Sequence, residues 1–126
     1  MTALGWAGFM AGGAIGASAR YLLDGMVGAR STGLFPWGTF VVNLTGSLAA
    51  GLLVGAALYH ALPTTLGAVV GGGFLGAFTT FSNFTFETVR LWQQGCAGRA
   101  AANALGTAVA GAAAAGAGVA LALALA

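Results

Sequence analysis

Charged residues are scarce in this sequence. Asp, Glu, Lys and Arg make up only 5% of its 126 residues, whereas soluble domains carry about 25%. A soluble fold of this length needs a charged surface, so the composition excludes an ordinary soluble domain. The formal net charge is only +2, so the charge balance gives no indication of nucleic-acid binding, and we expect no nucleic-acid partner.

Residues that carry out chemistry are equally rare. Cys96 is the only cysteine, which excludes an intrachain disulfide. The sequence shows no pairing of a nucleophile with a base and no cluster of metal-ligating side chains. We therefore expect that the protein is not an enzyme.

Apolar residues, in contrast, make up 59% of the chain. Crossing a bilayer takes about 20 such residues, and four stretches are long enough, at about residues 4–28, 36–60, 65–92 and 99–125. Almost nothing is left over for a soluble domain. The sequence predicts an all-α integral membrane protein, a single membrane domain over residues 1–126 with four transmembrane helices, in the inner or plasma membrane.

The third apolar stretch is a poor uninterrupted helix. Residues 71–87 read GGGFLGAFTTFSNFTFE, with three adjacent glycines followed by hydroxyls among phenylalanines. In lipid, a broken helix persists only where its freed backbone groups are buried in protein or line a cavity. Transport proteins place ion sites at such breaks. We expect the third helix to be broken near its middle, and the protein to conduct or transport a solute.

Glycines recur every four residues, at Gly8, Gly12 and Gly16 and again at Gly51 and Gly55. This spacing lets helices approach closely in lipid. Four short helices cannot enclose a pore and also present a lipid-facing exterior. The pattern therefore predicts an oligomer.

Polar residues at membrane depth form two tracks. Thr39, Asn43 and Ser47 share one face of the second helix, since they are four residues apart. The Asn43 amide can donate two hydrogen bonds, either to an anion or water in a conduit or to a neighbouring helix. Asn103 and Thr107 form a weaker track on the fourth helix.

An aromatic stripe follows the third helix, formed by Phe74, Phe78, Phe81 and Phe84. Such stripes usually serve packing. Aromatic rings nevertheless have a positive edge, and ring edges that alternate with the hydroxyls of Thr80 and Ser82 can solvate a small anion. They would do so without the full positive charge that would trap it.

The charged residues allow several interpretations. Arg20 lies well inside the first stretch, where a charge marks function by default, although a pair with Asp24 or a snorkelling side chain would also explain it. Glu87 and Arg90 are expected to pair. The four arginines lie towards the first and third loops, which the positive-inside rule places in the cytoplasm.

Three motifs together resemble the Fluc/CrcB family of fluoride channels: Gly16-Ala17-x-x-Arg20-Tyr21, then Pro36-Trp37-Gly38-Thr39-x-x-Val42-Asn43-x-x-Gly46, and Gly73-Phe74-x-Gly76-x-x-Thr79-Thr80-Phe81-Ser82-x-Phe84. The resemblance covers all four stretches in order. It implies a small four-helix protein that assembles as an antiparallel dimer and exports fluoride passively. It also implies two pores per dimer and one central sodium ion.

The resemblance assigns roles to individual positions. The sodium ligands would be the backbone carbonyls of Gly76 and Thr79 in both subunits, and Arg20 would be the vestibule cation. Asn103 departs from the family pattern, which has an aromatic residue there. The dimer would contain two copies of this chain or one copy and a paralogue. The residues that line the fluoride pore would be Asn43, Thr80, Phe81, Ser82, Phe84 and Thr107.

Two other functions stay open at this point. A small multidrug exporter is also a dimer of four-helix subunits, but such proton-coupled cation exporters resemble one another in a membrane-embedded carboxylate on the first helix. Here that helix offers only Asp24, near its end. A non-transport assembly subunit of a larger membrane complex is favoured by nothing except small size.

Overall fold

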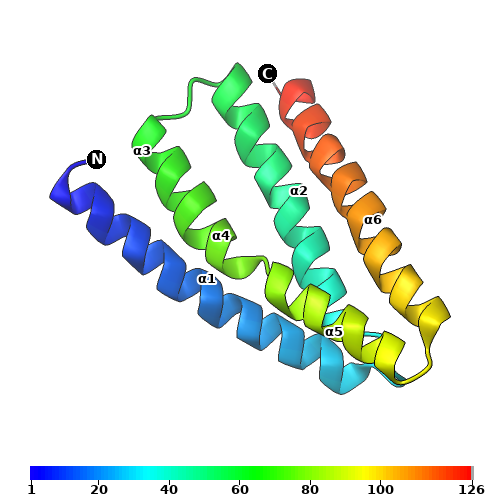
Figure 1. Ribbon diagram of the computed structural model, residues 1–126. Coiled ribbons are helices and arrows are strands. Elements are labelled where there is room, and N and C mark those ends of the chain that lie inside the picture. The colour runs from blue at the N-terminus through cyan, green and yellow to red at the C-terminus, as the bar shows by residue number, and fades with distance from the viewer. Residues whose placement is uncertain (126) are drawn as a thin grey trace.

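The computed structural model describes residues 1–125, and this part of the chain contains helices and no strand (Figure 1). Three long rods are α1 (Ala3–Arg30), α2 (Trp37–Tyr59) and α6 (Ala97–Ala124). The rod between α2 and α6 is composite. It consists of α3 (Thr64–Gly67), the π-helix η1 (Ala68–Leu75), α4 (Gly76–Phe78) and α5 (Phe81–Gln93).

The rods run alternately up and down. The N-terminus, the α2–α3 connection and the end of α6 lie at one end of the molecule, and the α1–α2 and α5–α6 connections lie at the other (Figure 1). The latter two connections contain Gly33 and Gly95, whose φ angles of 105° and 75° suit glycine because it has no Cβ. Short turns at these two points bring successive rods side by side.

Three of the rods are long and apolar enough to cross a membrane: Trp37–Tyr59, Thr64–Gln93 and Ala97–Ala124. The chain is therefore a multi-pass membrane protein. α1 has 28 residues and is also long enough, at about 1.5 Å per residue. It carries Arg20, Asp24 and several glycines, however, and is correspondingly less apolar.

The glycine repeats lie where rods touch. A Cβ on Gly12 would come within 2.9 Å of the Val69 carbonyl, and one on Gly16 would overlap the carbonyl of Phe74. In return, a Cβ on Gly73 would lie 2.6 Å from the Phe9 carbonyl. The backbones of α1 and η1 are thus in direct contact, as the spacing predicts.

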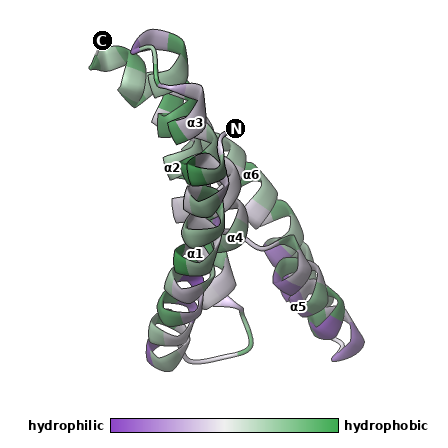
Figure 2. Ribbon diagram, turned by 90° about the vertical axis from the view of Figure 1, so that its left-hand side faces the viewer, coloured by the Kyte–Doolittle hydropathy of each residue, from purple (hydrophilic) through white to green (hydrophobic). Residues whose placement is uncertain are grey.

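The second repeat packs α2 against α6 in the same way. Gly51 lies against Ala115 and Gly55 against Ala122. From the other side, a Cβ on Gly118 would come within 2.7 Å of the Leu52 nitrogen. Many large apolar side chains are exposed along the rods. Hydrophilic residues gather near the lower ends of α1 and α5 in Figure 2. Such an exterior suits lipid.

Candidate functional site

The interruption of the third rod lies at Thr79 and Thr80. Both residues have extended backbones, with φ and ψ of −75° and 157° at Thr79 and −144° and 117° at Thr80. The N–H and the hydroxyl of Thr79 both donate to the Leu75 carbonyl, at 2.9 and 3.0 Å. Thr80 then starts α5, because its hydroxyl accepts a bond from the Asn83 N–H at 3.2 Å. The predicted bend in this helix is confirmed.

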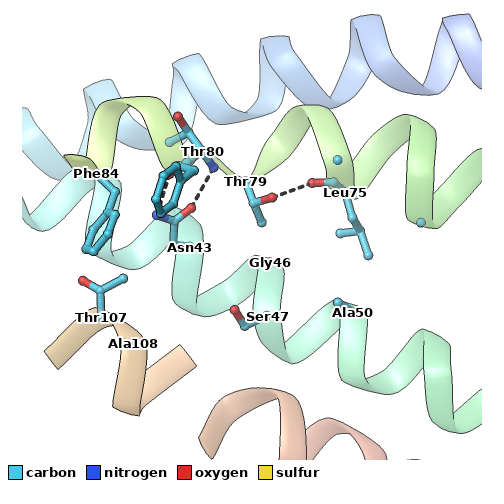
Figure 3. Close-up of a pocket in the computed structure, with 13 residues that line it drawn as sticks. Asn43, Gly46, Ser47, Ala50, Leu75, Thr79, Thr80, Phe84, Thr107 and Ala108 are labelled. Carbon is cyan, nitrogen blue, oxygen red and sulfur yellow. Dashed lines mark hydrogen bonds between the residues drawn. The ribbon is translucent and has the colours of Figure 1, made fainter. Parts of the chain in front are cut away.

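Asn43 of α2 holds this break in place. Its Oδ1 accepts the Thr80 N–H at 2.8 Å, and its Nδ2 donates to the Thr80 carbonyl at 2.9 Å (Figure 3). The amide therefore supplies both partners that an extended residue loses when a helix is interrupted. Because a carboxamide has two N–H groups, one donor of Asn43 is left over from this pair.

A cavity of about 540 Å³ opens beside the break. Its walls come from α2, from the part of the third rod between Gly71 and Phe84, and from α6 (Figure 3). None of the lining residues is charged. They are Asn43, Gly46, Ser47, Ala50, Gly71, Leu75, Gly76, Thr79, Thr80, Phe81, Phe84, Thr107 and Ala108. Most of the residues predicted to form a pore, and both predicted sodium ligands, are thus brought together.

The aromatic stripe divides at the break. The rings of Phe74 and Phe78 stack with centroids 5.7 Å apart and planes 10° apart, and Phe78 is buried against Gly46. These two rings pack helices. The rings of Phe81 and Phe84 have centroids 5.8 Å apart and planes at 44° to each other. Both residues line the cavity. Phe81 is 77% exposed.

Two predicted site residues lie outside the cavity wall. Ser82 is exposed at the start of α5, with its Oγ 3.3 Å from the Oγ1 of Thr80. Arg20 is half-buried on α1. Neither residue lines the cavity.

The charged side chains are arranged differently from the pairs that their spacing suggested. Across residues 1–125 the structure shows no hydrogen bond or ion pair between Arg90 and Glu87, so that expected pairing is wrong. The same part of the chain shows none between Arg20 and Asp24, which was one alternative for Arg20. Glu87 instead accepts a bond from the buried Thr39 hydroxyl through Oε1 at 3.0 Å. Its Oε2 is buried and has no partner in the described part of the chain.

A second polar cluster lies behind the cavity and was only partly visible in the sequence. Asn103 is fully buried. Its Nδ2 donates to the Thr88 hydroxyl at 2.8 Å and lies 3.4 Å from the Phe84 carbonyl, and its Oδ1 accepts the Thr107 hydroxyl at 3.4 Å. The spacing of Asn103 and Thr107 was noticed in the sequence, but the contribution of Thr88 was not. The four-residue step from Phe84 to Thr88 on the same helix was the available signal.

Comparison with known proteins identifies relatives over most of the chain. Residues 7–119 match the family described as "CrcB-like protein, Camphor Resistance (CrcB)". A protein of Streptomyces avermitilis named fluoride-specific ion channel FluC 1 is 46% identical over 108 residues, which is 86% of this chain and 87% of that protein.

Two further relatives come from other organisms. FluC 1 of Frankia casuarinae is 44% identical over 112 residues, covering 85% of this chain and 87% of that protein. FluC 2 of Haloarcula marismortui is 47% identical over 96 residues, covering 76% of this chain and 75% of that protein. Together with the apolar rods, these matches place the protein in the cell membrane. The chain belongs to the CrcB-like family.

Proposed function

We propose that this protein is a fluoride-selective channel that exports fluoride passively across the membrane. The observation that carries the proposal is the uncharged cavity at the break, which is lined by the rings of Phe81 and Phe84 and by hydrogen-bonding side chains. The relatives described above are named as fluoride-specific ion channels. An export route of this kind needs no bound substrate-activating group, only a lining that replaces water around the ion.

The lining suits a small anion. Burying an unpaired ion is prohibitive, so each water that fluoride gives up needs a replacement donor. The remaining N–H of Asn43 and the hydroxyl of Ser47 are available for this, and the Thr107 hydroxyl can be diverted from its bond to Asn103. The positive edges of Phe81 and Phe84 would add weak attraction. With no cation in the wall, the ion is attracted without being held, which conduction requires.

We propose further that α1 is a fourth membrane crossing and that two copies assemble antiparallel, each with its own pore. In a single copy the cavity is open at the side, and Phe81 is largely exposed although it lines the cavity. A second copy would cover this side. The partner would be an identical chain or a paralogue.

A sodium ion would fit the end of α4. A helix leaves its last carbonyls without partners inside the helix. Gly76 lies in the last turn before the break, and Thr79 follows α4 directly. Gly76 is exposed and has no side chain to cover its backbone. In the described part of the chain no group of His, Cys, Asp and Glu could hold a metal, so carbonyl oxygens would be the ligands, and hard oxygen ligands suit an alkali cation. Paired copies would supply two such sets.

Arg20 would act as the vestibule cation. Within residues 1–125 it makes no ion pair with Asp24, and its charge would raise the local concentration of anions. Its position outside the cavity wall is consistent with attraction at the entrance, and not with binding inside the pore.

Ion efflux from liposomes tests the proposal. Purified protein is reconstituted into vesicles loaded with potassium fluoride or potassium chloride, and efflux is started with valinomycin and followed with ion-selective electrodes. We expect rapid fluoride efflux and no chloride efflux above that of protein-free vesicles. Exchange of cationic drugs for protons would instead support a multidrug exporter, and no flux of any kind would support an assembly subunit.

A further inference from the structure

We infer that Asn103 is a positioning residue that holds two walls of the cavity, Phe84 and Thr107, in the arrangement that conducts. The inference rests on the proposed function, since it specifies a part of the same pore. Asn103 is fully buried and does not line the cavity. It lies directly behind two residues that do.

The side-chain amide of Asn103, a residue of α6, makes hydrogen bonds to residues of both α5 and α6. Its Nδ2 donates to Thr88 Oγ1 at 2.8 Å and lies 3.4 Å from the Phe84 carbonyl, both on α5. Its Oδ1 accepts the hydroxyl of Thr107, one turn further along α6, at 3.4 Å. Thr88 reinforces the arrangement, because its own hydroxyl donates to the Phe84 carbonyl at 2.7 Å. The backbone that carries the Phe84 ring is thereby fixed relative to α6.

This arrangement also directs the hydroxyl of Thr107. Its proton points to Asn103 Oδ1 across 3.4 Å, a long and therefore weak bond. A hydrogen bond to an ion is stronger than one to a neutral acceptor. Thr107 can therefore turn its proton to a passing anion and return it to Asn103 afterwards. Asn103 competes with the ion for this donor, which keeps the ion from remaining bound.

A double-mutant cycle tests the role. Fluoride efflux per folded channel is compared for the native protein, Asn103→Leu, Thr107→Val and the double variant. We expect each single change to lower the rate about tenfold and the double variant to be no slower than the slower single one, since neighbours that act through one bond are not additive. Thr107→Ser should match the native rate only when Asn103 is present.

The matched control is Thr85→Val on α5, the helix that carries Phe84 and Thr88. The Thr85 hydroxyl donates only to carbonyls of its own helix, those of Phe81 and Ser82, so this variant should conduct normally. If Asn103→Leu does not assemble, Thr88→Val replaces it in the cycle, because it removes the shortest bond of the amide. A normal rate for Asn103→Leu per folded channel, or additive effects in the double variant, would overturn the inference.

A second measurement does not depend on which ion is conducted. 4-Fluorophenylalanine at position 84 gives a fluorine NMR line that reports the surroundings of the ring without added fluoride. Asn103→Leu should shift and broaden this line, and Thr85→Val should leave it unchanged. An unchanged line in Asn103→Leu overturns the positioning role even if the native protein conducts nothing, whereas absence of native fluoride flux defeats only the proposed function.

Discussion

Phe78 and Phe81 are three residues apart in the sequence and have different surroundings. Phe78 is buried against Gly46 and stacked on Phe74, whereas Phe81 is 77% exposed and faces the cavity. Phe81→Ile keeps the apolar bulk but removes the ring edge that we propose attracts fluoride. We expect a folded protein with fluoride efflux lowered at least about tenfold, or more than about 1.4 kcal/mol of lost attraction at the barrier.

Phe78→Ile is the matched control. It should lower the free energy of unfolding by about 1–3 kcal/mol, because the smaller side chain leaves a gap in a buried contact. Efflux per folded channel should stay close to the native rate. If the two substitutions have the same effects, Phe81 is a packing residue and its place in the pore is wrong.

Arg20 allows a second test on single residues. We expect Arg20→Gln to slow fluoride efflux severalfold at low ionic strength and much less at high ionic strength, because salt screens the long-range attraction between a cation and anions in solution. The preference for fluoride over chloride should not change. Efflux measured in vesicles at two salt concentrations checks this, and a variant that fails to assemble at either concentration would indicate a structural role instead.

At the scale of the elements, α1 and η1 are joined through glycine. We expect Gly16→Ala to lower the thermal stability of the purified protein by about 1–3 kcal/mol, because the added methyl overlaps the Phe74 carbonyl and forces two backbones apart. Gly25→Ala on the same helix is the control. It has open space around it, so it should be neutral or stabilise by about 0.5–1 kcal/mol.

The third rod shows how far the sequence could be interpreted. The three adjacent glycines and the hydroxyls predict an interrupted helix, and the rod is interrupted. The interruption is at Thr79 and Thr80, however, whereas the glycines lie in an unbroken π-helix packed on α1. The amide that stabilises the break belongs to Asn43, 37 residues away from Thr80. No local pattern contains such a partner.

The candidate site was predictable to a similar degree. The polar face of α2 contributes Asn43 and Ser47 to the cavity wall, and the aromatic stripe contributes Phe81 and Phe84. The other members of these two patterns, Thr39, Phe74 and Phe78, do not line the cavity.

The expected pair of Glu87 and Arg90 was wrong because a spacing of three residues shows only that two side chains share a face. Whether they meet depends on the neighbouring helices. Here Glu87 accepts a hydrogen bond from Thr39 of α2 and does not pair with Arg90. The burial of Asn103 depends on α5 in the same way.

At the scale of the whole molecule, the proposed sodium site links ion binding to assembly. If carbonyls of Gly76 and Thr79 from two copies hold the ion, sodium binds the dimer alone and stabilises it by mass action. We expect the dimer to dissociate at lower temperature or dilution when sodium is replaced by N-methylglucamine. Size-exclusion chromatography in the two salts measures this, and dimer stability that is indifferent to the cation would contradict the site.

The two hydrogen bonds from Asn43 to the backbone of Thr80 have a consequence for the temperature dependence of fluoride flux. The two extended residues, Thr79 and Thr80, are not glycines, and Asn43 holds Thr80 by two hydrogen bonds. We therefore expect the angle between α4 and α5 to stay constant. We therefore expect an ion to pass while side chains rotate, on a picosecond-to-nanosecond scale, without microsecond movements of whole helices. We expect the fluoride flux to have a small activation enthalpy, close to that of ion diffusion in water, when efflux rates are measured at several temperatures in a fluid bilayer. A steep temperature dependence would mean that α4 and α5 move relative to each other during conduction.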